Sequence, residues 1–189
     1  MKKILITGGT GFIGSHLAEK AVKKGFKVFV FDRYNPNFSL GNLVSSRFKK
    51  NIEFIFGDIR DYDSVNKSVK KVDYVFHLAC IPRVAYSVEQ PVHTMLNNVI
   101  STSIVLDFAK RKNVKRVVYS GSSSVVGNGD GPASPYALQK LTSELETKLY
   151  SNLYGIDTVS LRYFNVYSPD QKADSPYATA VANWMRHIE

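Results

Sequence analysis

Residues 6–16 read ITGGTGFIGSH and place glycines at positions 8, 11 and 14, directly after the apolar residues 4–6. Glycine costs backbone entropy, so this spacing indicates a need for unusual φ angles or for space. A strand, a glycine-rich turn and a helix in succession are typical of a dinucleotide-binding site. We predict that Gly8 permits the tight turn, that Gly11 lets the backbone approach a pyrophosphate and that Gly14 lets the helix pack close to the strand. An ordinary glycine turn is the alternative, because the spacing is G-x-x-G-x-x-G rather than G-x-G-x-x-G.

Short β-branched runs alternate with longer helical patterns along the rest of the chain. The predicted strands are residues 4–7, 27–31, 52–56, 74–77, 116–120 and 157–161. The predicted helices are residues 13–24, 62–70, 91–112 and 135–153. The last helix has the clearest period, with Leu138, Leu141, Leu145 and Leu149 on one stripe. This alternation predicts an α/β fold, a doubly wound parallel sheet of the Rossmann type.

Length and composition fit an ordinary globular protein. The 189 residues allow one well-cored domain or slightly more, and 44% of them are hydrophobic. No apolar run approaches the roughly 18 residues of a membrane span, and the basic start lacks the apolar segment of a signal peptide. The lone Cys80 cannot form an internal disulfide, so we expect a buried, inert thiol and a cytoplasmic protein.

The formal net charge is +9, and the densest basic stretch is KRKNVKR at 110–116. Nucleic-acid binding usually combines clustered charge with a recognisable binding module, and we find no such module in the sequence. We interpret the charges as solvated helix faces and loop ends that also attract an anionic ligand. We therefore expect no nucleic-acid partner, no membrane partner and no metal site.

Acidic residues follow two of the predicted strands. Asp32 closes the second strand, where a carboxylate can accept hydrogen bonds from an adenosine ribose. A carboxylate there favours NAD over NADP, although the neighbouring Arg33 keeps NADP open. Asp58 and Ile59 follow the third strand at the same sheet edge, where Asp58 can meet the adenine. The alternatives are a strand-end turn residue for Asp32 and a helix cap for Asp58.

Tyr136 and Lys140 are four residues apart in the helix that follows Pro135, so they share one helix face. A free tyrosine has a pKa near 10 and is a poor base at neutral pH. An ammonium about 4 Å away contributes roughly 4 kcal/mol at an effective dielectric constant near 20, or about three pKa units. We therefore predict a phenolate that is available near neutral pH.

A serine-rich segment, Gly121-Ser122-Ser123-Ser124, follows the predicted fifth strand. A hydroxyl there can bond a substrate oxygen and hold it against Tyr136. A plain serine-rich turn is the alternative.

The motifs of the whole chain resemble those of one enzyme family. They are TGGTGFIGSHL, GDIRD, HLAC, NNV at 97–99, VVYSGSSSVVG, SPYALQK and LRYFNVYSP at 161–169. In this order, they make the chain similar to the extended short-chain dehydrogenases/reductases, specifically the NAD-dependent sugar-nucleotide epimerase/dehydratase family, with the UDP-sugar 4-epimerases closest. The resemblance covers nearly the whole chain. It implies NAD as the cofactor, a UDP-linked nucleotide sugar as the substrate and a homodimer formed by the helices at 91–112 and 135–153.

The resemblance also implies roles for individual residues. The catalytic serine, tyrosine and lysine correspond to Ser122, Tyr136 and Lys140. Cofactor-binding positions correspond to Gly8, Gly11, Phe12, Ile13, Gly14, Asp32, Asp58, Ile59, Ala79, Asn97, Tyr136, Lys140 and Tyr163 or Phe164. Substrate-binding positions correspond to Arg83, Ser87, Ser122 and Asn165, with Asn165 at the substrate diphosphate.

The residues after the catalytic hydroxyl help to sort reactions within the family. Sugar 4,6-dehydratases resemble Thr-Asp-Glu there, whereas Ser123 and Ser124 supply no carboxylate, which favours 4-epimerisation. The implied mechanism has Tyr136 removing the 4-hydroxyl proton while NAD⁺ takes hydride from C4 and later returns it to the other face of a 4-keto sugar. A dehydratase or reductase of the same family, and an NAD-binding module without turnover, are the alternatives.

The chain departs from the family pattern in two places. It stops at Glu189, before most of the family's substrate-binding region. We therefore expect an NAD-binding Rossmann domain with the catalytic residues at 1–165 and the start of a truncated substrate-binding region at 166–189. Ser122 and Tyr136 are only 14 positions apart, where the family usually has a longer loop. Both departures remove substrate contacts and leave the cofactor cleft whole.

Overall fold

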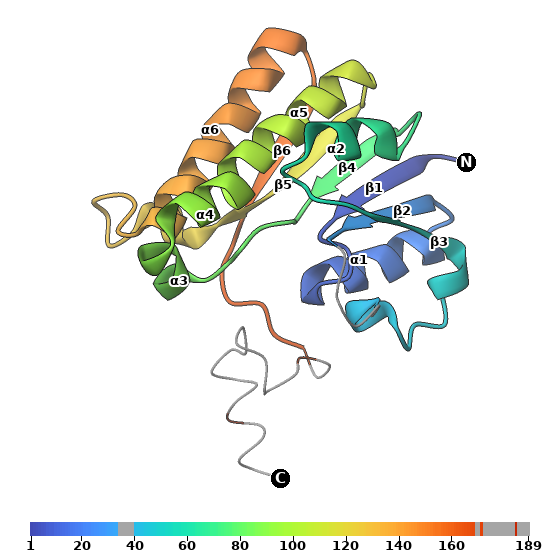
Figure 1. Ribbon diagram of the computed structural model, residues 1–189, viewed down its shortest axis with the longest axis horizontal. Helices are drawn as coiled ribbons and strands as arrows, with labels where there is room; N and C mark the ends of the chain where they lie inside the picture. Colours follow the sequence, from blue (N-terminus) through green and yellow to red (C-terminus); the bar gives the residue numbers. More distant parts are fainter. Residues whose placement is uncertain (34–39, 169–170, 172–183, 185–189) are drawn as a thin grey trace.

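A six-stranded parallel sheet forms the centre of the computed structural model, which describes residues 1–33, 40–168, 171 and 184 (Figure 1). The strands are β1 (Lys3–Thr7), β2 (Lys27–Asp32), β3 (Ile52–Phe56), β4 (Tyr74–His77), β5 (Arg116–Ser122) and β6 (Asp157–Tyr163). Their order is β3-β2-β1-β4-β5-β6, and every neighbouring pair is parallel. This is the doubly wound order, which brings all carboxyl ends of the strands to one edge. The predicted fold class is confirmed.

Helices connect the strands and cover both faces of the sheet. They are α1 (Phe12–Lys23), α2 (Tyr62–Ser68), α3 (Val84–Glu89), α4 (Pro91–Met95), the π-helical turn η3 (Leu96–Ile100), α5 (Ser101–Arg111) and α6 (Pro135–Tyr154). The short 3-10 turns are η1 (Gly41–Leu43), η2 (Lys49–Asn51) and η4 (Ser123–Val126). In the described part of the chain, every helix is too short or too polar to span a bilayer.

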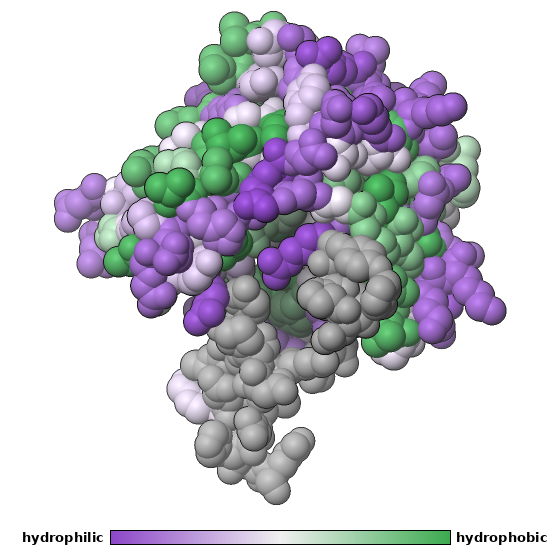
Figure 2. Space-filling view, viewed as in Figure 1, coloured by the Kyte–Doolittle hydropathy of each residue, from purple (hydrophilic) through white to green (hydrophobic). Residues whose placement is uncertain are grey.

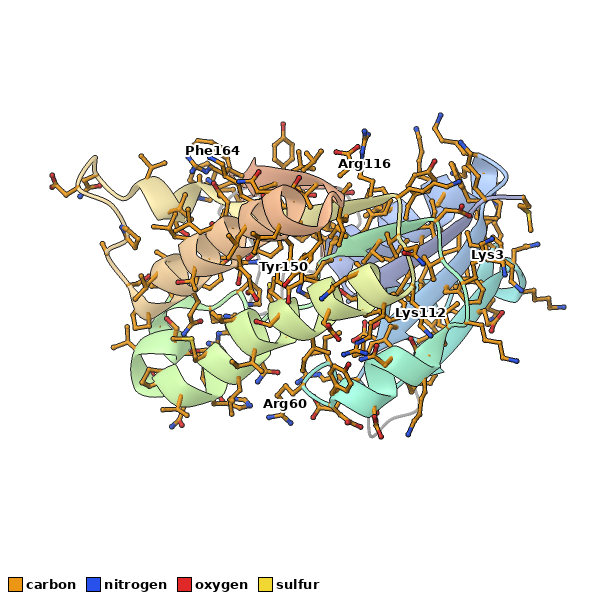
Figure 3. The ribbon with its side chains drawn as sticks, turned by 90° about the horizontal axis from the view of Figure 1, so that it is seen from above. Lys3, Arg60, Lys112, Arg116, Tyr150 and Phe164 are labelled. Carbon is orange, nitrogen blue, oxygen red and sulfur yellow. The ribbon has the colours of Figure 1, made fainter. Side chains whose placement is uncertain are left out.

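The strand side chains alternate between two cores. Ile4 and Ile6 of β1 pack with α1 on one face, whereas Leu5 packs with α2 and α5 on the other. The same alternation continues in β2, where Val28 and Val30 join the first core. Figures 1 and 3 show α5 and α6 side by side on the face opposite α1. The period-2 pattern therefore decides which helix each side chain meets.

Two helical predictions were wrong in detail. The segment 91–112 is interrupted by the π-helical turn η3, and at the start of α5 the hydroxyl groups of Ser101 and Thr102 donate to the carbonyl oxygens of Asn97 and Asn98 in that turn. The short helix α3 was not predicted, because six residues are too few to show a period. Most of the predicted region 166–189 lies outside the described residues.

The leucine stripe of α6 faces outward. Leu138, Leu145 and Leu149 are 51%, 58% and 50% exposed. The buried face of α6 carries Tyr136, Ala137, Gln139, Lys140, Ser143 and Thr147. Polar side chains are buried there because they bond side chains and backbone carbonyl oxygens of neighbouring segments. The most regular apolar period in the sequence therefore lies on the exposed face of α6 and not on its buried face.

Candidate active site

The glycine-rich turn joins β1 to α1 with the geometry that the spacing predicts. Gly8 has a φ of +70°, and its N–H donates to the carbonyl oxygen of Phe31 at 2.9 Å. A Cβ on Gly14 would lie 2.3 Å from the carbonyl oxygen of Gly8, so only glycine lets α1 begin this close to the turn. Gly9, which lies outside the predicted pattern, also needs its small size, because a Cβ would lie 2.7 Å from the Val30 side chain.

The N-terminus of α1 opens toward the carboxyl edge of the sheet. Gly11 is its N-cap and has no side chain to bond the first-turn N–H groups, and the first turn contains no acidic residue. Phe12 and Ile13 begin the helix and, with His16 and residues 166–168, line a cavity of about 240 Å³. Uncapped N–H groups and the positive end of the helix dipole suit an anion such as a diphosphate.

Asp32 ends β2 beside this turn. Its Oδ2 accepts hydrogen bonds from the Thr10 N–H at 2.9 Å and the Thr10 hydroxyl at 2.6 Å. Its Oδ1 accepts the N–H of Arg33 at 2.8 Å. The carboxylate therefore holds the glycine-rich turn in place. This is also the structural role that the alternative interpretation, a strand-end turn residue, gave to Asp32. Thr10, which the sequence pattern did not single out, is the residue that links the two.

Asp58 lies after β3 and is held by Arg60, whose Nε donates to Asp58 Oδ1 at 2.9 Å. The hydrogen bond from the Arg60 side chain is the main reason that the pKa of Asp58 lies below its ordinary value. The helix-cap alternative for Asp58 is wrong, because Asp61 caps α2 and accepts the N–H of Asp63 at 3.0 Å. Ile59 packs against the core beneath α2 and α5.

His77, at the end of β4, is buried behind the glycine-rich turn. Its Nδ1 lies 2.7 Å from the Thr7 hydroxyl and its Nε2 lies 3.1 Å from the Thr102 hydroxyl. The Thr102 hydroxyl donates to the carbonyl oxygen of Asn98 at 2.7 Å, so its oxygen accepts from His77 and the proton is assigned to Nε2. Burial, with a smaller contribution from the charge of Lys140, lowers the pKa of His77 to about 3. The imidazole is therefore neutral at physiological pH.

Helix α6 presents Tyr136 and Lys140 at the carboxyl end of β5. Ser134 caps the helix by accepting the Ala137 N–H at 3.1 Å. The buried Lys140 ammonium donates to the carbonyl oxygen of Ser120 at 2.7 Å and lies 5.9 Å from the centre of the Tyr136 ring. The structure thus brings the predicted tyrosine and lysine together on one helix face.

Ser122 completes this cluster from the end of β5. Its hydroxyl lies 2.8 Å from the Ser124 hydroxyl, and its side chain faces the Tyr136 phenol. The oxygen of Ser122 accepts the N–H of Ser124 at 3.2 Å, so this serine also caps η4. Ser122 was interpreted either as a substrate-bonding hydroxyl or as part of a serine-rich turn. These two interpretations are compatible, because one hydroxyl can serve in both.

The predicted direction of the Tyr136 pKa needs correction. Burial raises the pKa of Tyr136 above its ordinary value, and the charge of Lys140 offsets this only in part. The prediction from the sequence took account of the Lys140 charge but not of the loss of water around the Tyr136 side chain. This residue is only 9% exposed. The residues described here therefore do not by themselves bring a phenolate to neutral pH.

The pKa of Lys140 and the exposure of Cys80 also differ from what burial alone and the sequence predict. Burial lowers the pKa of Lys140, but the neighbouring Cys80, Tyr119 and Tyr136 outweigh it, so the pKa stands above its ordinary value. Cys80 was expected to be buried and inert. Instead it is partly exposed, and its thiol lies near the Lys140 ammonium.

The predicted substrate residues are placed differently from one another. Ser87 is fully buried, where its hydroxyl donates to the carbonyl oxygen of Val84 at 2.6 Å and accepts the N–H of Tyr136 at 3.0 Å. It therefore positions α6 and offers no surface to a ligand. Arg83 and Asn165 are exposed at the carboxyl edge of the sheet.

The remaining predicted cofactor residues surround the same edge. Ala79 follows β4, and its N–H donates to the Thr7 hydroxyl at 3.2 Å. Asn97 lies in η3 and donates from Nδ2 to the carbonyl oxygen of His93 at 2.8 Å. Tyr163 ends β6 half-buried, and burial raises its pKa, whereas Phe164 is exposed and is labelled in Figure 3.

Comparison with known proteins identifies one family and several similar chains. The model of the NAD dependent epimerase/dehydratase family matches residues 4–189. A putative UDP-glucose 4-epimerase of Methanocaldococcus jannaschii is 36% identical over 180 residues, which cover 89% of this chain and 57% of that protein.

Two solved structures are similar over most of the chain. The UDP-N-acetylglucosamine 4-epimerase from Methanobrevibacter ruminantium M1, in complex with UDP-N-acetylmuramic acid, superimposes with a TM-score of 0.88 at 35% identity and covers 99% of this chain and 62% of its own. The UDP-glucuronic acid 4-epimerase from Bacillus cereus, in complex with UDP-glucuronic acid and NAD, has a TM-score of 0.81 at 34% identity and covers 92% of this chain and 60% of its own. The chain spans less than two thirds of the length of each of these relatives.

Proposed function

The chain belongs to the NAD dependent epimerase/dehydratase family, and on this premise we propose that it forms the cofactor-binding and catalytic part of a nucleotide-sugar 4-epimerase. The proposed substrate is a UDP-hexose or a UDP-N-acetylhexosamine. One observation supports this most directly: Ser122, Tyr136 and Lys140 meet at the sheet edge toward which the uncapped N-terminus of α1 opens. A phosphate-binding helix end and a polar catalytic cluster at one edge suit a dinucleotide and a sugar lying side by side.

The residues around the glycine-rich turn fit NAD. Gly11, Phe12 and Ile13 would hold the diphosphate through the free end of α1, and Asp32 would accept hydrogen bonds from the adenosine ribose. Other proposed cofactor contacts are Gly8, Gly14, Asp58, Ile59, Ala79, Asn97, Tyr163 and Lys140. When bound, NAD⁺ would supply the redox group for C4 of the sugar, as an acceptor of hydride and, once reduced, as its donor to the opposite face.

The side chains of the catalytic cluster handle the proton of the reaction. Tyr136 would remove the proton of the sugar 4-hydroxyl, and Ser122 would bond the same oxygen and hold it in place. Burial opposes ionisation of Tyr136, and among the described residues the charge of Lys140 is the largest contribution that favours the phenolate. Ser123 and Ser124 supply no carboxylate for eliminating water, which favours epimerisation over dehydration. Arg83 and Asn165 are the proposed substrate contacts.

We place the domain boundary near residue 165, with the cofactor-binding domain before it and the start of a substrate-binding region after it. The surface of the last strand supports this division. Val159 and Leu161 of β6 are partly exposed on the α1 side of the sheet, and Phe164 is 80% exposed. Apolar side chains at the end of a Rossmann sheet are usually covered by further chain, and the relatives are longer than this chain.

A homodimer is the proposed assembly. The outward leucines of α6 lie beside exposed Val92, Leu96 and Ile100 of α4 and η3, and Figure 2 shows hydrophobic residues grouped where Figure 1 places α4, α5 and α6. A contiguous apolar surface on two neighbouring helices suits a second copy of the same surface. Sedimentation should show a dimer that dissociates when Leu145 and Leu149 are both changed to Glu. A monomer mass at every concentration of the unaltered chain would contradict the proposal.

The Tyr136→Phe variant tests the catalytic proposal. It should bind NAD as the unaltered chain does but should no longer interconvert UDP-glucose and UDP-galactose, or their N-acetyl counterparts, in a chromatographic assay. Tyr150→Phe is the matched control, because this tyrosine of α6 packs in the core away from the cluster and should keep its activity. Unchanged epimerisation in Tyr136→Phe would exclude the phenolate. NAD binding without turnover in the unaltered chain would instead identify a cofactor-binding module.

A further inference from the structure

Two buried carboxamide side chains bond each other between α6 and η3. Gln139 comes directly before Lys140 on the buried face of α6 and is 1% exposed, and Asn98 in η3 is 2% exposed. The Nδ2 of Asn98 donates to the Oε1 of Gln139 at 2.8 Å. A buried carboxamide is costly unless its oxygen and its N–H groups find partners. The other partners of the two side chains therefore show what this pair connects.

Asn98 binds the main chain of the segment that follows β4. Its Oδ1 accepts the N–H of Ile81 at 2.7 Å, and its Nδ2 donates to the carbonyl oxygen of the same residue at 3.3 Å. One side chain thus pairs with both main-chain polar groups of Ile81, as a neighbouring strand would. Residues 78–83 have no regular secondary structure. The position of this segment therefore depends on the Asn98 side chain.

Gln139 binds α4 with the other end of its carboxamide. Its Nε2 donates to the Thr94 hydroxyl at 2.9 Å and to the carbonyl oxygen of Pro91 at 3.4 Å. Thr94 is fully buried, and its hydroxyl donates to the carbonyl oxygens of Gln90 and Pro91, each at 3.1 Å. Its oxygen is then left to accept the N–H of Gln139. Gln139 is therefore fixed on both sides.

The direction of each bond in this chain follows from the main chain of Ile81. Its N–H can only donate, so the atom of Asn98 that faces it is the oxygen, and Nδ2 is left for Gln139. Gln139 must then present Oε1 to Asn98 and Nε2 to Thr94. An apolar side chain in place of Gln139 would leave Nδ2 of Asn98 with its 3.3 Å contact to Ile81 and without its shorter bond.

We infer that Gln139 is a positioning residue, which acts through Asn98 to hold the main chain of Ile81 in a fixed place relative to α6. The inference rests on the proposed function in one respect, the assignment of Ala79 and Arg83, on either side of Ile81, as cofactor and substrate contacts. Without the Gln139 carboxamide, the Asn98 side chain is free to turn, and the segment after β4 loses its anchor. Bound cofactor must then order this segment again, which costs conformational entropy.

Backbone ¹⁵N relaxation of the full chain in Gln139→Met tests this at a single residue. Methionine keeps the volume of the side chain but removes both polar ends. The order parameter of the Ile81 N–H should fall from about 0.85, the value of rigid backbone, to below about 0.6. Thr147→Val is the matched control and should leave this order parameter unchanged. The Thr147 hydroxyl is equally buried on the same face of α6, but it bonds the carbonyl oxygen of Ser143 in its own helix.

NAD binding, measured by calorimetry, supplies the functional readout. Ordering the backbone of one residue costs enough free energy to weaken binding about tenfold, so Gln139→Met should bind NAD about ten times more weakly than the unaltered chain. Thr147→Val should bind NAD as the unaltered chain does, even if it lowers the free energy of unfolding. A purely structural role of Gln139 would lower stability without moving either the Ile81 order parameter or the NAD affinity.

Thr94→Val provides a second variant. It leaves Gln139 in place but removes the hydroxyl that Nε2 binds, so the Ile81 order parameter should fall by less. If circular dichroism shows that Gln139→Met does not fold, Thr94→Val decides the question. The inference is wrong if the Ile81 order parameter is unchanged, if it falls equally in Thr147→Val, or if NAD binds Gln139→Met as tightly as the unaltered chain. If the unaltered chain binds no NAD, the proposed function fails, and the order parameter alone decides the role of Gln139.

Discussion

Acid should destabilise this protein through one buried histidine. His77 has a pKa of about 3 in the folded chain, because burial and the charge of Lys140 oppose its protonation. In the unfolded chain its pKa is about 6.5. A group whose folded pKa is lowered contributes stability that is fully present above the unfolded pKa and is lost as the pH falls toward the folded pKa. The window for His77 therefore runs from about pH 6.5 down to about pH 3.

The size of the effect follows from linkage. Each pKa unit corresponds to about 1.36 kcal/mol, so between pH 7 and pH 5 the unfolded histidine gains most of a proton and the folded one gains none. The free energy of unfolding should fall by about 2 kcal/mol over this interval from His77 alone. For a chain of this size, that corresponds to a melting temperature lower by roughly 4–8 °C.

His77→Gln supplies the comparison. Glutamine does not titrate, and its side-chain amide offers an acceptor toward Thr7 and a donor toward Thr102, as the neutral imidazole does. Urea unfolding of both proteins, followed by circular dichroism at pH 7 and pH 5, gives the difference in free energy. Other groups that change protonation between the two pH values act equally in both proteins and cancel.

The unaltered chain should lose about 2 kcal/mol more than His77→Gln between the two pH values. An equal loss in both proteins would refute the reasoning, because it would mean that His77 takes up its proton as readily in the folded chain as in the unfolded one. A variant less stable at both pH values by the same amount would show a packing defect and no linkage.

Three further outcomes are expected. Gly14→Ala should weaken NAD binding at least tenfold by calorimetry, because its Cβ would lie 2.3 Å from the carbonyl oxygen of Gly8 and α1 would have to move; unchanged affinity would contradict the role of the close approach. Asp32→Ala should weaken NAD binding by roughly ten- to hundredfold, the usual range for charged hydrogen bonds, while equal affinities would remove Asp32 from the cofactor site. Ser134→Ala should lower the free energy of unfolding by about 1 kcal/mol through loss of the α6 cap, measured in urea; no change would show that the cap is replaced by water.

Local patterns predicted most of the fold. The alternation of β-branched and helical segments gives all six strands, because strand and helix periods are properties of neighbouring residues. The glycine spacing likewise predicts the positive φ at Gly8 and the close packing of Gly14. The spacing of Tyr136 and Lys140 predicts their common face on α6. Each of these features depends on a few residues that are close in the chain.

The predictions failed where distant segments meet. Ser87 was expected at the substrate, but its hydroxyl is used by the N–H of Tyr136, which is 49 residues away. The sequence pattern did not single out Thr10, because its partner Asp32 lies 22 residues away in another element. A residue list cannot show such contacts, because they arise only when the sheet is assembled.

The sequence by itself predicted the order of the elements, the glycine-rich turn and the residues of the proposed catalytic cluster. Only the tertiary structure decided that the leucines of α6 face outward and that burial outweighs Lys140 at the Tyr136 phenol. The physical reason is the same in both cases. A period shows that a helix has two faces but not what covers either one, and the loss of water that shifts a pKa depends on atoms brought together from the whole chain.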